Sequence, residues 1–269
     1  MSLLKYRNRL KTVKSLNSIF TALQVVTMVR TQKIKEKYFA MERYLIPIRE
    51  VLRGRVPAEA LEKKALIVIT SSRGLCGNFN NLVIKKANQY LKDNPACQLM
   101  VLGKTGTDFY KKRKSPILFS SSDSMEKPSF AGIQRLIPQL MAFNCELYAV
   151  YNAYRSTMIQ VPTIVKLYPL PEELVLDSEP ADYLLEPDPA TLVNKLYRHY
   201  LEARLFQIIL NSVMGELGAR FMVLKGAVDT SKDMVTDLTL SINKARQTVI
   251  TRDLLEIVSA AEALRRDYE

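Results

Sequence analysis

Both ends of the chain carry apolar residues at the three- and four-residue spacing of an amphipathic helix. None of the twelve prolines follows Pro189, so the last 80 residues lack the strongest helix breaker. At ~1.5 Å per residue, a helix through that region would reach on the order of 110 Å. The apolar stripe of the C-terminal region includes Leu192, Leu196, Tyr200, Ala203, Phe206, Leu210, Val213, Leu217, Val235, Leu238, Ile242, Ala245 and Val249.

The first 55 residues repeat this pattern in two successive stripes, which begin at Tyr6 and Ile34. Neither terminal segment can bury its stripe alone, so we expect the two helices to wrap around each other. A compact domain between them would force the pairing to be antiparallel.

The middle of the chain alternates short apolar runs with helix-like stretches, which indicates a parallel sheet with covered faces. The predicted strands are Ala65–Thr70, Gln98–Leu102, Ile117–Phe119, Leu147–Tyr151 and Thr163–Tyr168. The predicted helices are Asn80–Leu91, Thr105–Lys112 and Phe130–Ala142. The expected fold is therefore α/β: a long antiparallel coiled coil of N- and C-terminal helices with an inserted small Rossmann-like parallel-sheet domain. We place an N-terminal coiled-coil helix at 1–56, the α/β domain at 57–189 and a C-terminal coiled-coil helix at 190–269.

Positive charge is concentrated at the N-terminal end. The chain has 39 Lys plus Arg against 27 Asp plus Glu, a net charge of +12. Residues 1–56 contain 13 of the basic residues and only 3 of the acidic ones, whereas 57–189 and 190–269 each have a net charge of +1. A solvated helix face would normally mix both signs, so an acidic partner surface is favoured. A nucleic-acid partner is not expected, because no recognition motif accompanies the charge.

Candidate catalytic and metal-binding groups are sparse. Three cysteines in no CxxC spacing and one histidine leave little basis for a metal site. A Cys–His pair from Cys76 or Cys145 with His199 lacks an orienting third group. Asp229, Asp233 and Asp237 share a helical face, but neighbouring Lys225, Lys232 and Arg220 favour a self-paired surface. We therefore predict no catalytic, cofactor-binding or metal-binding residue.

Two glycine-containing turns keep a nucleotide-binding α/β enzyme with helical extensions as the alternative. Gly103-Lys104-Thr105 ends like a phosphate-binding loop, but Gln98 stands where the first glycine is required. The turn after the first strand has Gly74 and Gly77, whereas the dinucleotide fingerprint needs three glycines. An enzyme of this class should bind nucleotide by itself.

The hydropathy of the sequence argues against a transmembrane helix. No run approaches the roughly 18–20 apolar residues that a transmembrane helix needs. The start, Met1-Ser2-Leu3-Leu4-Lys5-Tyr6, has no signal-peptide pattern, and an odd number of cysteines fits a reducing compartment. We expect a peripheral protein without a secretory signal.

Four segments together resemble the gamma subunit of F-type ATP synthases. The most specific is the C-terminal run Asp237–Thr251, followed by Leu255-Glu256-Ile257-Val258. The others are Ala219–Asp229, the turn Ser72–Asn80 and the segment Asp182–Pro189.

The resemblance implies a rotor without a catalytic site of its own. The terminal helices would form a shaft inside a 3:3:1 head of alpha, beta and gamma subunits, in which the beta subunits hold the nucleotide sites. The central domain would be a foot on a membrane ring of small subunits, beside the epsilon subunit. Ion flow through that ring, of protons or sodium, would then be coupled to ATP synthesis or hydrolysis.

The resemblance also implies contact residues. Arg246 and Gln247 match positions that contact the beta subunits, and Thr251 and Leu23 are assigned to the same contact. Tyr183 and Glu186 match positions near the membrane ring and epsilon.

Parts of the chain depart from the family pattern. Residues 16–30 lack two expected lysines and are bulkier than usual, Ser72 stands where Asp is common, and Ser259-Ala260 stands where Gly is common. Such divergence suggests a paralogue, such as the shaft of a dedicated ion-pumping ATPase, with the shaft of the main synthase as the alternative. The expected location is the cytoplasmic face of the bacterial inner membrane, with an organellar inner membrane as the weaker alternative.

Overall fold

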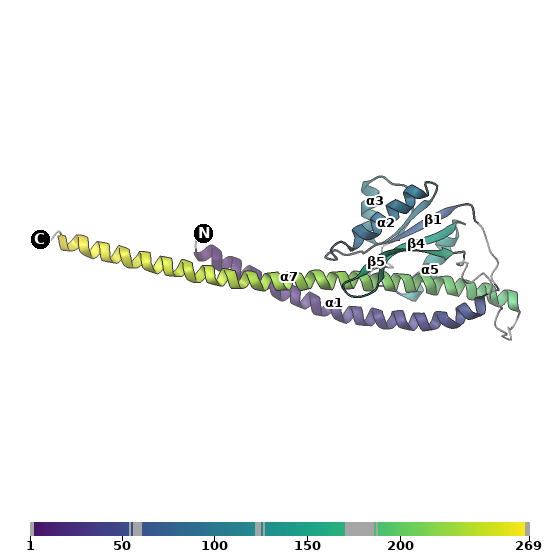
Figure 1. Cartoon of the computed structure of the whole chain (residues 1–269), viewed down its shortest axis with the longest axis horizontal. Helices are drawn as coiled ribbons and strands as arrows, with labels where there is room; N and C mark the ends of the chain where they lie inside the picture. Colours follow the sequence, from purple (N-terminus) through teal and green to yellow (C-terminus); the bar gives the residue numbers. More distant parts are fainter. Residues whose placement is uncertain are drawn as a thin grey trace. The chain divides into compact units, whose positions relative to one another are not determined.

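The computed structural model describes residues 3–53, 55, 61–121, 125, 127–169, 186 and 188–266, with backbone alone for 189 and 262–266. The chain divides into two compact units. The first, here called the helical unit, combines Met1–Val26 with Leu224–Glu269. The second, the sheet unit, is Thr27–Val223. Figure 1 shows the elements of both.

A five-stranded sheet with the order β3-β2-β1-β4-β5 organises the sheet unit. Its strands are β1 (Lys64–Ile69), β2 (Gln98–Leu102), β3 (Ile117–Ser121), β4 (Glu146–Tyr154) and β5 (Gln160–Tyr168). The first four strands pair in parallel, as predicted.

The last strand corrects the prediction of a parallel sheet, because β5 runs antiparallel to β4. The link between them is a short turn in which the Arg155 amide donates to the Ile159 carbonyl over 3.1 Å. A parallel connection requires a crossover of about a dozen residues, and this segment is too short to make one. The sheet is therefore mixed.

Helices cover both faces of the sheet. The shorter ones, α2 (Phe79–Asp93), α3 (Lys104–Lys112) and α5 (Phe130–Met141), begin and end within two residues of the predicted spans. One core lies beneath α2 and α3 and includes Leu66, Val68, Val83, Val101 and Tyr110. The larger core packs the opposite face against α5 and the two long helices, and includes Leu45, Ile67, Met100, Ile133, Leu205 and Ile209.

The two long helices are α1 (Leu3–Leu52) and α7 (Pro189–Arg266). Two glycines let α7 approach the β4–β5 hairpin closely. A Cβ atom at Gly215 would lie 3.2 Å from the Phe79 ring and 3.3 Å from the Asn152 carbonyl oxygen, and one at Gly218 would lie 3.1 Å from the Thr157 carbonyl oxygen. These glycines mark close packing, and the helix continues through them without a break.

In the helical unit, α1 and α7 run side by side in opposite directions, which confirms the predicted pairing of the terminal helices (Figure 1). The Asn17 side-chain amide donates to the Ser231 hydroxyl over 2.6 Å and to the Val228 carbonyl over 3.2 Å. Val13 and Val228 are buried at this seam. Among the described residues, no helix has the length and apolar character required to cross a membrane.

Candidate functional site

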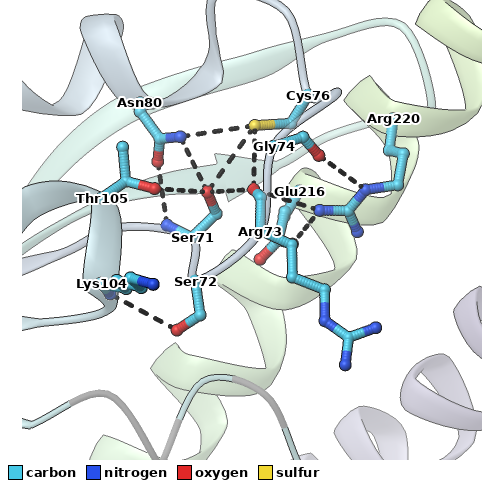
Figure 2. A network of polar contacts seen from close by, with 10 residues as sticks. All are labelled: Ser71, Ser72, Arg73, Gly74, Cys76, Asn80, Lys104, Thr105, Glu216 and Arg220. Carbon is cyan, nitrogen blue, oxygen red and sulfur yellow. Dashed lines mark hydrogen bonds and ion pairs between the residues drawn. The ribbon is translucent and has the colours of Figure 1, made fainter.

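The turn from β1 to α2 is held in shape by its own polar groups (Figure 2). The buried Asn80 side chain accepts from the Ser71 amide over 2.9 Å and donates to the Ser71 hydroxyl over 2.8 Å. That hydroxyl in turn donates to the Arg73 carbonyl over 2.8 Å. Leu75 and Gly77 have φ values of 61° and 56°, a region that few side chains tolerate. The turn is therefore a rigid structure that projects Ser72 and Arg73.

Arg220 of α7 ties this turn to the long helix (Figure 2). Its guanidinium donates to the Gly74 carbonyl over 3.2 Å and to the Arg73 carbonyl over 3.4 Å, and it forms an ion pair with Glu216 one helical turn earlier. The two side chains of the ion pair are 12% and 7% exposed. Burial raises the pKa of Glu216, while the positive charges of Arg220, Arg73 and Arg30 act in the opposite direction.

A strongly basic cavity of about 350 Å³ lies beside the turn within the sheet unit. Four segments far apart in the sequence form its wall: α1, the β1–α2 turn, residues before α5, and α7. Its charged lining residues, within the described part of the chain, are six cations and one carboxylate, namely Arg30, Lys33, Lys37, Arg73, Lys127, Arg220 and Glu216. Apolar walls of Ile34, Met125, Val213 and Leu217 lower the local dielectric and strengthen the attraction for an anionic group. The arrangement is suited to hold an acidic segment. None of the described lining residues is a nucleophile aligned with a base.

The start of α3, where a phosphate-binding loop would hold its ligand, is already occupied by oxygens of the chain. The amide of Thr105 donates to the Ser71 carbonyl over 3.1 Å, and the amide of Gly106 donates to the Thr70 hydroxyl over 2.9 Å. A phosphate binds a helix N-terminus through such amides when they are free. Gly103 is required for another reason, since a Cβ atom there would lie 2.1 Å from the Thr70 carbonyl oxygen. The Gly-Lys-Thr sequence thus serves a tight β2–α3 turn.

The cysteine and histidine that were candidates for a catalytic pair have different neighbours. His199 lies 3.4 Å from the carboxylate of Glu202, whereas the Cys76 thiol contacts Ser71 and Asn80. Burial raises the pKa of Cys76, which disfavours the nucleophilic thiolate. Within the described parts of the chain, no group of three or more His, Cys, Asp or Glu residues is placed to hold a metal ion.

The contact residues inferred from sequence are spread over both units. Arg246, Gln247 and Thr251 are exposed on α7 of the helical unit. Leu23 of α1 is 40% exposed in the same unit. Glu186 is exposed before α7, and Tyr183 lies outside the described residues.

Sequence reasoning missed the cavity and misplaced Arg220. We expected Arg220 on a surface shared with Asp229, Asp233 and Asp237, whereas it is largely buried against the β1–α2 turn. The i, i+4 spacing from Glu216 to Arg220 was the available signal, because oppositely charged residues at that spacing pair on a helix.

Comparison with known proteins accounts for this architecture. A family model described as ATP synthase matches residues 2–264. The chain is 30% identical over 279 residues to the ATP synthase gamma chain of Buchnera aphidicola subsp. Melaphis rhois, with 96% of each chain covered. It is 32% identical over 282 residues to the gamma chain of Pelotomaculum thermopropionicum, covering 98% of this chain and 99% of that one.

Solved structures show the same fold at lower identity. A chain of the Euglena gracilis mitochondrial ATP synthase, in a structure of OSCP, F1 and c-ring, aligns with a TM-score of 0.74 and 19% identity over 99% of this chain and 96% of that chain. A chain from the central stalk and c-ring of the Tetrahymena thermophila enzyme aligns with a TM-score of 0.56 and 16% identity over 80% of this chain and 99% of that chain. The family model and the end-to-end relatives together show that this chain belongs to the gamma-chain family of ATP synthase, the non-catalytic rotor subunit of the central stalk.

Proposed function

We propose that this chain is the shaft that couples a rotating membrane ring to the nucleotide sites of a head with three alpha and three beta subunits. Residues 1–56 and 190–269 form the shaft, and 57–189 form the foot that stands on the ring beside an epsilon subunit. Membership of the gamma-chain family and the pairing of the terminal helices support this assignment of shaft and foot.

The observation that carries the proposal is an exposed apolar segment of α7. From Asn243 to Ala261 every residue except Ala245 is exposed. Six large apolar side chains in this stretch are between 37% and 66% exposed: Val249, Ile250, Leu254, Leu255, Ile257 and Val258. At 3.6 residues per turn they spread over about 240° of the helix circumference. A helix that is apolar on most of its sides is typical of one enclosed by other protein, as a shaft inside a head would be.

The surface chemistry of both units supports the proposed contacts with the beta subunits. Arg246, Gln247 and Thr251 supply polar groups beside the exposed apolar residues, and Leu23 supplies an apolar contact on α1. The basic cavity of the sheet unit would receive an acidic segment of a beta subunit. Cations recessed among apolar side chains favour a carboxylate-bearing peptide over free solvent ions.

The foot is assigned to the membrane ring and epsilon through Tyr183 and Glu186. Bacterial gamma chains as full-length relatives support a position at the cytoplasmic face of the bacterial inner membrane. The bulky residues 16–30 support a divergent, ion-pumping version of the rotor. Met28 and Val29, exposed in this stretch, would meet the head.

Truncation tests the proposal most simply. Removing residues 245–269 should abolish coupling between ATP hydrolysis and ion pumping in the reconstituted complex. The foot should keep its fold, because its core contains none of these residues. Removing 262–269 is the matched control, since it leaves all six exposed apolar residues in place. Wild-type ion pumping and unchanged ATPase activity from the longer truncation would refute the shaft assignment.

A further inference from the structure

One edge of the sheet gathers loops that lie far apart in the sequence. Because β1, β2, β3 and β4 are parallel, the residues that precede these strands meet at their shared amino edge. The register places Lys64 beside Glu146, Ala65 beside Gln98, and Leu99 beside Ile117. Strand β5 is antiparallel, so its last residue, Tyr168, reaches the same edge beside Leu147.

The described residues at this amino edge are mainly basic and exposed. Three connections supply its cations: the residues before β1, the end of α2, and the segment from α3 to β3. Six exposed cations lie there, namely Lys63, Lys92, Lys111, Lys112, Arg113 and Lys114. The exposed carboxylates in the described parts of these connections are Glu62 and Asp93, and Asp108 is exposed on α3 four residues before Lys112. Glu146 does not offset this charge, because it is buried and bound to Lys166 over 3.0 Å.

Backbone hydrogen bonds fix the turn that contains the four consecutive cations at the end of α3. The amide of Arg113 donates to the Phe109 carbonyl over 3.3 Å, and the amide of Lys114 donates to the Lys111 carbonyl over 3.0 Å. Lys114 then turns the chain toward β3 with a φ of 54°. The Arg113 guanidinium lies 4.4 Å from the centre of the Phe109 ring and covers its face.

We propose that this amino edge, defined by Lys63, Lys92 and Lys111–Lys114, binds the anionic headgroups of a phospholipid bilayer. This inference rests on the proposed function, which places the foot at a membrane ring and therefore within reach of the surrounding lipid. Clusters of four to eight basic residues next to a bilayer are attracted to the negative cytoplasmic leaflet. The edge would steady the turning foot without fixing it, because lipids are mobile and each contact is weak.

The shape of the edge favours lipid over a folded acidic partner. The cavity beside the β1–α2 turn recesses its cations between apolar walls, whereas the amino edge presents its cations on exposed helix ends and turns of three different connections. Exposed, flexible lysines suit a laterally mobile anionic surface. Single-stranded nucleic acid is a poorer fit, because its bases need open aromatic faces and Arg113 covers that of Phe109.

Vesicle binding by the purified full-length chain tests this inference. The probes are phosphatidylcholine vesicles with and without 30% phosphatidylglycerol, with the chain measured by co-sedimentation. We expect binding to the anionic vesicles alone and a steep loss between low and physiological salt. A triple variant, Lys111→Gln, Lys112→Gln and Lys114→Gln, should bind about tenfold more weakly or worse.

The matched control removes the same charge from exposed lysines of the helical unit: Lys5→Gln, Lys11→Gln and Lys14→Gln. It should bind like the wild type. Equal loss in both variants, binding independent of phosphatidylglycerol, or tighter binding to a 20-nucleotide RNA than to vesicles would overturn the inference. Circular dichroism of both variants checks folding. Because the vesicles contain no head subunits, failure here leaves the coupling experiment on residues 245–269 unaffected.

Discussion

The two halves of α7 differ in where their packing partners come from. Between Leu201 and Gly218, every residue except Arg204 and Asn211 is buried, and the sheet, α5 and α1 supply the covering surface. Between Asn243 and Ala261, every residue except Ala245 is exposed, although the apolar spacing is similar. The same sequence pattern thus has two outcomes. One half of the helix completes a core within its own chain. The other half is left uncovered by the described residues, and in the proposed assembly the head would cover it.

Replacing one leucine in each half of α7 by alanine should give the greatest difference in stability. Leu205→Ala removes a fully buried side chain and should lower the free energy of unfolding by about 2–5 kcal/mol. Leu254→Ala, at a side chain that is 57% exposed, should change it by less than about 0.5 kcal/mol. Urea unfolding of the two variants checks this prediction. Equal destabilisation by both would show that the distal half is packed within the isolated chain.

Two glycines of α7 provide the next comparison. Gly215→Ala forces a Cβ atom against Phe79 and the Asn152 carbonyl, and should cost about 1–3 kcal/mol. Gly226→Ala meets no atom within 4 Å and should stabilise the helix by about 0.5–1 kcal/mol. Opposite shifts in melting temperature are the expected result, and a shift in the same direction for both would contradict it.

The seam of the helical unit predicts a smaller effect. Asn17→Ala removes two hydrogen bonds to α7, and should destabilise the pairing of the helices by about 1 kcal/mol. Ser18→Ala is the control, because the Ser18 hydroxyl donates only to the Lys14 carbonyl of its own helix in a described contact. Amide exchange near Val228 should accelerate in the first variant and stay unchanged in the second. Equal exchange rates in the two variants would show that the Asn17 hydrogen bonds do not stabilise the pairing of the helices.

The smallest effect concerns the thiols of the sheet unit. Burial raises the pKa of Cys97 to about 11 from an ordinary value of 9.0, so the folded chain retains a proton that the unfolded chain releases. The resulting contribution to stability is complete below pH 9 and is lost as the pH rises toward 11. Iodoacetamide should alkylate Cys97 slowly at pH 8 in buffer and much faster in urea. Similar rates in both conditions would contradict the raised pKa.

Sequence patterns predicted the elements well because each has a local cause. The strand Gln98–Leu102 begins and ends where its apolar run does, and α2 extends its predicted span by a residue or two at each end. The direction of β5 was missed, since alternation of strand and helix was extended to a pair of strands with no helix between them. The short link Arg155–Ile159 could have indicated the antiparallel direction, because it is too short for a parallel crossover.

The candidate site was harder to predict than the fold, because tertiary packing assembles it. The basic N-terminal segment indicated an acidic partner, but nothing local to Arg30 or Lys33 indicates that they share a cavity with Arg73. Arg220 was misplaced for the same reason, since its partners Gly74 and Arg73 are more than 140 residues away in the sequence. Periodicity reports which face of a helix is apolar, and it does not report what covers that face.

Hydrogen exchange on the full-length chain, alone and assembled with alpha and beta subunits, tests whether the head encloses residues 243–261. Amides in residues 201–218 should be equally protected in both states, because their packing lies within this chain. Amides in residues 243–261 should exchange much more slowly in the assembly, where the head would enclose them. Unchanged exchange in 243–261 within an intact assembly would contradict the assignment of this segment to the shaft.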